Sequence, residues 1–118
     1  MLHLSPSVQY FLYSEPVDMR KGHYGLSGLV SSCMKQNVLS GAVFIFMNKR
    51  YNKIKLLQWD KDGFAVFEKH LERGTFERVQ LNNNQNIELS SLQLQLILQG
   101  VILKSVKHKV RYQHPQAS

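Results

Sequence analysis

The sequence predicts an α+β fold in which an antiparallel β-meander of about four to five strands packs against one main helix and a short second helix. Three observations lead to this fold class. Strand-length apolar runs fill the middle of the chain, an apolar face with helical spacing precedes them, and a leucine-rich stretch with a helix-capping residue follows them. At 118 residues, the chain has the length of one domain. We expect a single domain over residues 1–103 and a basic C-terminal tail over residues 104–118.

The first predicted elements are a strand and the main helix. Residues 8–13 (VQYFLY) are rich in β-branched and aromatic side chains and lie between Pro6 and Pro16, which predicts a strand. Asp18 is a suitable N-cap for the helix that follows. The buried face of this helix is predicted to contain Met19, Leu26, Leu29, Val30, Cys33 and Met34.

Three glycines, spaced three residues apart, lie within the predicted helix: Gly22, Gly25 and Gly28. We interpret them as a face that lets the helix pack closely on the sheet. A phosphate-binding loop is the alternative, but such a loop usually follows directly after a strand. Cys33 is the only cysteine, and its apolar surroundings predict a packed, inert thiol.

The central strands follow one another with short connections. Residues 41–48 form a continuous apolar run, which predicts a buried strand, and residues 53–60 alternate as a second strand. The sequence DKDG at residues 60–63 predicts a tight turn into a third strand over residues 64–74. Residues 75–81 (TFERVQL) are consistent with a fourth strand.

The second helix is predicted over residues 90–100, with Ser90 as its N-cap and Gly100 at its C-terminal end. The leucines of this segment also alternate, which leaves a strand as the alternative. These residues are Leu92, Leu94, Leu96 and Leu98.

The charge distribution points to an anionic partner. The net charge is +7, and residues 49–78 hold eight of the fifteen Lys and Arg residues. Nucleic acid is the usual partner of a small basic domain. A single cysteine excludes a disulfide framework. No stretch approaches the roughly 20 apolar residues that span a bilayer, so we expect a cytoplasmic protein without a membrane partner.

Three stretches together resemble one known family: DMRKGHYGLSGLV, GAVFIFMNKRYNKIKLLQWDKDGFAVFEKHLERGTF and LSSLQLQLILQG. In this order and spacing they are similar to the accessory proteins, called TnpB, encoded by the second open reading frame of IS66-type insertion sequences. The resemblance covers roughly residues 4–103.

The resemblance implies a role in transposition beside a separate, larger transposase that carries the acidic catalytic residues. It therefore implies a non-enzymatic protein without a cofactor, with the transposase and the DNA of the element ends as partners. His23 departs from the family pattern, which usually has Phe there. The family's recurrent features map onto Asp18, Arg20, Lys21, Gly22, Gly25, Trp59, Asp60, Asp62, Gly63, Leu71, Glu72, Arg73 and Gly74.

The residues that could carry chemistry have structural interpretations. Asp18 is explained as a cap, and Asp60 and Asp62 are explained by the turn that they flank. A metal-dependent nuclease using Asp60 and Asp62 is the less favoured alternative. No histidines are paired at helical spacing and no cysteine cluster accompanies them. We therefore predict no catalytic residue and no metal ligand.

The basic side chains are the best candidates for a functional surface. We predict DNA contacts for Lys49, Arg50, Lys53, Lys55, Arg20, Lys21 and Arg73, extended by Lys104, Lys107, Lys109 and Arg111 of the tail. Two alternatives stay open. The strand lysines could instead protect an exposed sheet edge, and the two arginines could pair internally, for example with Asp18 or Glu72. Trp59 follows an apolar strand, which favours a core position over a base-stacking one.

The leading hypothesis is a non-catalytic DNA-binding accessory factor that assists the transposase. The alternative is a protein-interaction module that binds the transposase with little DNA contact. Such a module would need an exposed apolar surface, for which the candidates are Phe44, Phe46, Phe64 and Phe67.

Overall fold

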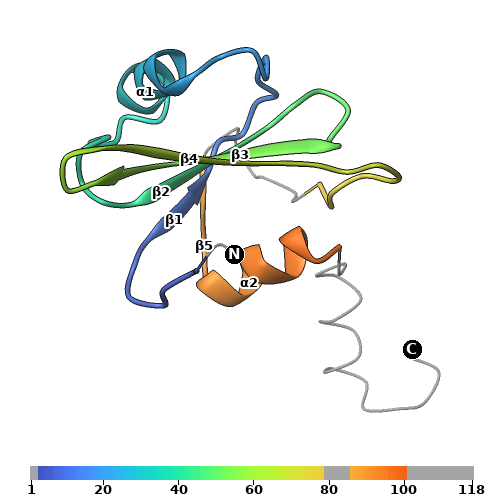
Figure 1. The fold of residues 1–118 in the computed structure, drawn as a ribbon. Coiled ribbons are helices and arrows are strands. Elements are labelled where there is room, and N and C mark those ends of the chain that lie inside the picture. The colour runs from blue at the N-terminus through green and yellow to red at the C-terminus, as the bar shows by residue number, and fades with distance from the viewer. Residues whose placement is uncertain (1–2, 79–85, 101–118) are drawn as a thin grey trace.

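A computed structural model describes residues 3–78 and 86–100 of the chain. One five-stranded sheet and two helices make up this part of the chain, which confirms the α+β fold class (Figure 1). The predicted tail, residues 104–118, lies outside the described residues. The elements are β1 (Tyr10–Leu12), α1 (His23–Ser32), β2 (Val43–Met47), β3 (Lys53–Asp60), β4 (Gly63–His70), β5 (Ile87–Leu89) and α2 (Ser91–Leu98).

The sheet has the strand order β4-β3-β2-β1-β5. Strands β2, β3 and β4 form the predicted antiparallel meander. Strand β1 pairs in parallel with β2, with Tyr10 opposite Val43, and antiparallel with β5. The sheet is therefore mixed and not wholly antiparallel. The reason is α1, which connects β1 to β2, because a crossover connection lets the second strand run in the same direction as the first.

The two helices cover opposite faces of the sheet (Figure 1). Strand β2 lies at the centre and is buried along its whole length, as its continuous apolar run predicts. The core on the α1 side contains Leu26, Val30, Met34, Phe44, Phe46 and Leu57. The core on the α2 side contains Ile45, Ile54, Leu56, Phe76, Leu94 and Ile97.

The start of α1 differs from the prediction. The N-cap is Gly22, which makes no side-chain capping bond, so the prediction of Asp18 as the cap is wrong. The Asp18 carboxylate instead accepts a hydrogen bond from the backbone N–H of Arg20, at 2.9 Å. An aspartate that bonds a backbone donor two residues ahead forms a local turn, and this turn competes with helix capping.

The glycines and the cysteine of α1 also differ from the prediction. A Cβ atom at Gly22 or Gly28 would meet nothing within 4 Å, and at Gly25 it would meet only the Lys21 side chain. The close-packing interpretation of the glycines is therefore wrong, because nothing in the sheet approaches them. Cys33 is exposed and not packed.

The segment after β4 holds no strand where it is described. Phe76 is buried in the core on the α2 side, and its backbone N–H donates to the Tyr51 carbonyl. Residues 75–78 are therefore irregular, and residues 79–81 lie outside the described residues. The second helix follows the prediction, since Ser90 caps α2 and forms a reciprocal capping box with Gln93.

A candidate nucleic-acid interface

The turn between β2 and β3 is organised by one asparagine. The Asn48 Oδ1 atom accepts from the backbone N–H groups of Asn52 and Lys53, each at 3.0 Å. The Asn48 amide also donates to the Asn52 side chain, at 2.6 Å. Lys49 and Arg50, both exposed, are therefore carried by a turn with a defined backbone. Asn48 was not among the residues predicted from the sequence to have a role.

A hollow of about 430 Å³ lies between this turn and the segment that precedes α1. The two segments are joined because the backbone N–H of Val17 donates to the carbonyl of Met47, at 2.8 Å. Four cations predicted to contact DNA thereby line one hollow, although they come from distant parts of the sequence. We call them the basic surface: Arg20, Lys49, Arg50 and Lys53.

Two acids lie among these cations. Glu68 and Asp18 both line the hollow. The Arg20 Nη2 atom lies 2.6 Å from Asp18 Oδ2, which confirms that an internal partner of Arg20 is Asp18. Hydrogen bonds from the Arg20 side chain and backbone hold the pKa of Asp18 far below its usual range. Asp18 therefore stays ionised and offsets part of the Arg20 charge.

Lys53 and Lys55 lie on the same face of β3 but have different surroundings. Lys53 is half-buried and reaches the hollow. Lys55 is only 8% exposed, and its Nζ donates to the Lys21 carbonyl at 2.8 Å and lies 3.9 Å from Glu68 Oε1. The Lys55 ammonium thus holds the backbone at the entry to α1. Its charge points into the protein and not towards solvent.

The loop after β4 brings further cations to the β2–β3 turn. The Leu71 N–H donates to the Asn52 carbonyl at 2.8 Å, and Arg73 is exposed in the same loop. The Arg78 guanidinium lies 4.4 Å from the centre of the Tyr51 ring, a cation–π contact that the sequence analysis missed. Lys21 is exposed beside α1. The tail cations lie outside the described residues: Lys104, Lys107, Lys109 and Arg111.

The opposite end of β3 is the predicted tight turn. Asp60 pairs with Gly63 across the hairpin, and the Asp62 N–H donates to the Asp60 carbonyl. Lys61 has a φ of 59°, in the left-handed region that tight reversals require. The carboxylates of Asp60 and Asp62 are on exposed residues. Within residues 3–78 and 86–100, no group of three or more His, Cys, Asp and Glu residues is placed to hold a metal ion.

The aromatic residues separate into buried and half-buried sets. Phe44 and Phe46 are fully buried, so the expectation that they form part of an exposed surface is wrong. Phe64 and Phe67 are half-buried. Trp59 is half-buried as well and contacts the edge of Phe64. The expected core position of Trp59 is therefore wrong, because Trp59 lies at the end of β3, next to the exposed turn, and belongs to neither core cluster.

Comparison with known proteins decides the family. The model of the family described as IS66 Orf2 like protein matches residues 8–108, which is most of the chain. The chain belongs to the IS66 Orf2-like family. The match includes the basic turn, the Asp60–Gly63 turn and both helices, and it extends past residue 103 into the segment that we treated as a tail. This membership supports an accessory role in insertion-sequence transposition.

Two relatives of this IS66 Orf2-like protein come from Sinorhizobium fredii (strain NBRC 101917 / NGR234). The uncharacterized protein y4jC is 28% identical over 109 residues, covering 92% of each chain. The uncharacterized protein y4hO is 30% identical over 101 residues, covering 86% of this chain and 87% of the relative. No solved structure shows a significant match.

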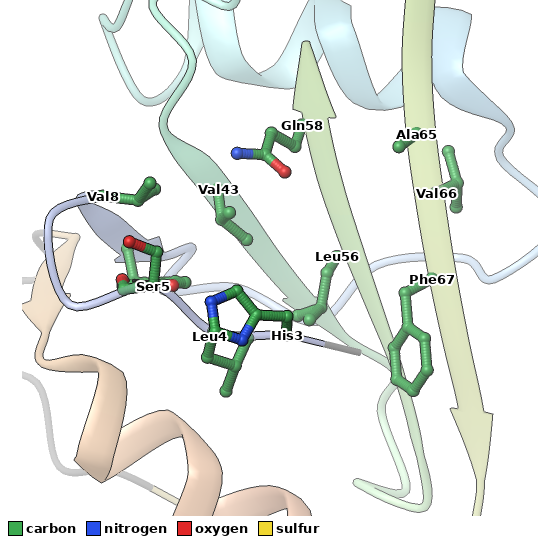
Figure 2. Close-up of a pocket in the computed structure, with 11 residues that line it drawn as sticks. His3, Leu4, Ser5, Val8, Val43, Leu56, Gln58, Ala65, Val66 and Phe67 are labelled. Carbon is green, nitrogen blue, oxygen red and sulfur yellow. Dashed lines mark hydrogen bonds between the residues drawn. The ribbon is translucent and has the colours of Figure 1, made fainter. Parts of the chain in front are cut away.

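A second hollow in the IS66 Orf2-like fold lies on the α2 side of the sheet. It has a volume of about 530 Å³ and is lined mainly by apolar groups. Figure 2 shows Val43, Leu56 and Phe67, from three neighbouring strands, with His3 and Leu4 beside them. No helix in the described ranges is long and apolar enough to cross a membrane.

Proposed function

We propose that this IS66 Orf2-like protein is a non-catalytic accessory factor that binds DNA through the basic surface and assists a separate transposase. The observation that carries this proposal is the convergence of Arg20 with Lys49, Arg50 and Lys53 around one hollow. Cations spread along a sequence give only a net charge, whereas cations gathered on one surface can follow a phosphate backbone.

The turn between β2 and β3, together with Lys53 at the first position of β3, is the part that would reach DNA. Strand β2 is buried along its whole length and β3 is buried over residues 54–57, so the two strands cannot enter a groove. Lys49 and Arg50 project from the turn, where phosphate contacts are possible without readout of bases. Such contacts orient a protein on DNA, which is what an accessory factor at an element end would need.

The expected salt dependence follows from the charges. Four cations form the basic surface, and Asp18 offsets part of one of them. Neutralising about three to four phosphates gives a log K against log salt slope of about −3 to −4. This slope is shallower than that of a protein with many phosphate contacts. It fits a factor whose affinity is supplemented by a partner.

The absence of catalysis is part of the proposal. A metal-dependent nuclease needs acids that converge on a cation. Asp60 instead precedes the two-residue reversal at the end of β3, and Asp62 lies within it, away from the basic surface. The nucleic-acid strand held by the cations would therefore lie away from these carboxylates.

The test is a salt titration with two fluorescent duplexes of equal length, one from the terminal repeat of the element and one scrambled. We expect binding of both duplexes with the slope given above, and tighter binding of the terminal repeat if the protein itself recognises the end. Absence of binding to either duplex at low salt would contradict DNA binding by this protein.

The apolar hollow on the α2 side supports a second candidate function, binding of the transposase itself. Ala65 on the edge strand is exposed, lies opposite Gln58, and lines this hollow with Leu4 and Phe67. An Ala65→Lys change would then abolish co-purification with the transposase of the same element, while Lys53→Glu would leave co-purification intact. If instead Lys53→Glu abolished co-purification and the variant in the hollow did not, the protein would contact the transposase through the basic surface or through bound DNA.

A further inference from the structure

Four aromatic rings form a continuous row on the α1 side of the sheet. Trp59 meets Phe64 edge-on at 5.0 Å between ring centres. Phe64 stacks on His23 at 5.6 Å, and His23 stacks on Tyr24 at 5.6 Å with an angle of 10° between the planes. We call these residues the aromatic row. His23 keeps the row continuous although its ring is an imidazole.

The outer ring of the row has no role in the core. Tyr24 is 87% exposed, whereas Phe64 packs against the core on the α1 side. The Phe64 ring is therefore held by the core, and the Tyr24 ring stacks on His23 in solvent. The nearly parallel rings of His23 and Tyr24 offer an exposed aromatic face to a partner.

The aromatic row is joined to the basic surface by the segment that leads into α1, because Arg20 of the basic surface lies four residues before Tyr24 and the exposed Lys21 lies between them. Lys53 and Trp59 lie six residues apart in β3, a distance of roughly 20 Å at the usual rise per residue. Between them, Lys55 bonds the carbonyl of Lys21, two residues before His23. A nucleic-acid strand whose phosphates lie on the basic surface would therefore reach the aromatic row after about six nucleotides.

We infer that the aromatic row stacks unpaired bases of a DNA strand whose phosphates lie on the basic surface. This inference rests on the proposed function and names its substrate class, a duplex with a frayed or single-stranded end. Aromatic side chains stack on any base, because every base has a π-face. Bases inside an intact duplex are already stacked and cannot reach Tyr24.

The charges near the row favour bases over phosphates. Asp60 and Asp62 lie in the turn between Trp59 and Phe64, with Lys61 between them. Two carboxylates repel a phosphate at this end of β3. The backbone of the bound strand would therefore stay on the basic surface and beside Lys21, while its bases turn towards the rings.

Trp59 supplies a direct signal, because it is the only tryptophan in the chain. The experiment compares a blunt duplex with the same duplex carrying an overhang of about six thymidines, followed by Trp59 fluorescence and by anisotropy of a dye on the DNA. We expect the overhang to quench Trp59 and to bind about tenfold more tightly. The blunt duplex should leave Trp59 fluorescence unchanged.

Two variants and a control test whether the tighter binding of the overhang DNA depends on the aromatic row. Tyr24→Ala should bind the overhang DNA no more tightly than the blunt duplex, and its binding of the blunt duplex should be unchanged. Tyr24→Phe keeps the ring and should bind the overhang DNA as tightly as the unchanged protein does. The matched control is Leu92→Ala, since Leu92 is another exposed apolar side chain, at 61%, on α2 across the sheet. Leu92→Ala should bind both DNAs as the unchanged protein does.

The outcomes separate this inference from the proposed function. Equal affinity for both DNAs without quenching would overturn the aromatic row and leave duplex binding standing. Tyr24-dependent binding of the overhang without binding of the blunt duplex would support the row and overturn duplex binding. A change in sedimentation of Tyr24→Ala with unaltered overhang binding would overturn the row as a DNA site, because the ring would then contact another copy of the chain.

Discussion

The two ends of β3 present different chemistry to solvent. At its start, the β2–β3 turn projects Lys49 and Arg50 beside Lys53. At its end, the tight turn alternates acids with Lys61, and half-buried rings lie beside it. Strand β3 therefore separates an end that carries cations from an end that carries acids, one lysine and aromatic rings.

This difference shows that placement matters more than the number of charges. Residues 49–78 hold eight cations and five acids, yet only some of the cations lie where a phosphate could reach them. Lys55 belongs to the same alternating face as Lys53, but its ammonium is bonded to a backbone carbonyl.

The largest effect is expected at Lys55. A Lys55→Glu change would bury a carboxylate beside Glu68 and leave the Lys21 carbonyl without its donor, so we expect a loss of about 3–5 kcal/mol in the free energy of unfolding. Urea denaturation measures this loss. Lys55→Met keeps the apolar stem and should lose less. If Lys55→Glu unfolds at the same urea concentration as the unchanged protein, Lys55 does not hold the entry to α1.

Removing Asn48 should disturb the basic turn. Asn48→Ala leaves the backbone N–H groups of Asn52 and Lys53 without their acceptor, at an expected cost of about 1–2 kcal/mol in unfolding free energy. Duplex affinity should fall as well, because Lys49 and Arg50 lose their fixed positions. The matched control is the exposed Asn37, whose side chain accepts a single hydrogen bond.

Equal losses of stability in Asn48→Ala and Asn37→Ala, with duplex binding unchanged in both, would contradict the organising role of Asn48. Hydrogen exchange of the Asn52 and Lys53 amides gives an independent measurement. These amides should exchange faster in Asn48→Ala, because each is then bonded to water.

A smaller change, of opposite sign, is expected at Asp18. Asp18→Asn removes a negative charge from the basic surface and releases Arg20, so duplex affinity at pH 7 should rise by about two- to threefold. The lowered pKa of Asp18 means that its carboxylate stays charged well below the unfolded value of about 3.9. The ion pair should therefore persist as pH falls from 7 to 5 and be lost only in stronger acid.

The pH dependence of Asp18 can be followed by NMR titration of its carboxyl carbon. The stability that the pair contributes is present above the unfolded pKa and is lost as pH falls through the folded pKa. A titration midpoint at the ordinary aspartate value, or weaker duplex binding by Asp18→Asn, would contradict the pairing with Arg20.

The acidic end of β3 should show the smallest effect of all. Millimolar Mg²⁺ or Mn²⁺ should shift the melting temperature by no more than about 1 °C, because a cation bound only by the folded state would raise it progressively. Differential scanning fluorimetry measures this shift. A concentration-dependent rise that Asp60→Asn/Asp62→Asn abolishes would restore the nuclease hypothesis.

The sequence predicted the elements whose pattern is local. The continuous run of β2, the DKDG turn and the Ser90 cap all carry their signal within a few residues, and all are present. The parallel pairing of β1 with β2 could not be predicted from the two strands alone, because it depends on where α1 crosses the sheet. Asp18 fitted two local structures equally well, a cap and a turn, and the turn formed.

The sequence predicted which cations belong to the candidate site, but it did not predict how the fold arranges them. The cations of the β2–β3 turn are adjacent in sequence, so their clustering was foreseeable. The approach of Arg20 to the β2–β3 turn depends on the backbone hydrogen bond between Val17 and Met47. This hydrogen bond joins segments thirty residues apart. The burial of Lys55 likewise depends on the position of the Lys21 carbonyl, and no pattern within β3 distinguishes Lys55 from Lys53.

The most direct test of the central claim compares two lysines at opposite ends of β3. Lys49 and Lys61 are both exposed turn residues, so Lys49→Glu and Lys61→Glu make the same charge change at exposed positions. The measurement is the salt slope for a blunt terminal-repeat duplex. We expect a slope shallower by about one unit for Lys49→Glu and an unchanged slope for Lys61→Glu. Equal changes in both variants would contradict this expectation, because binding would then follow net charge alone.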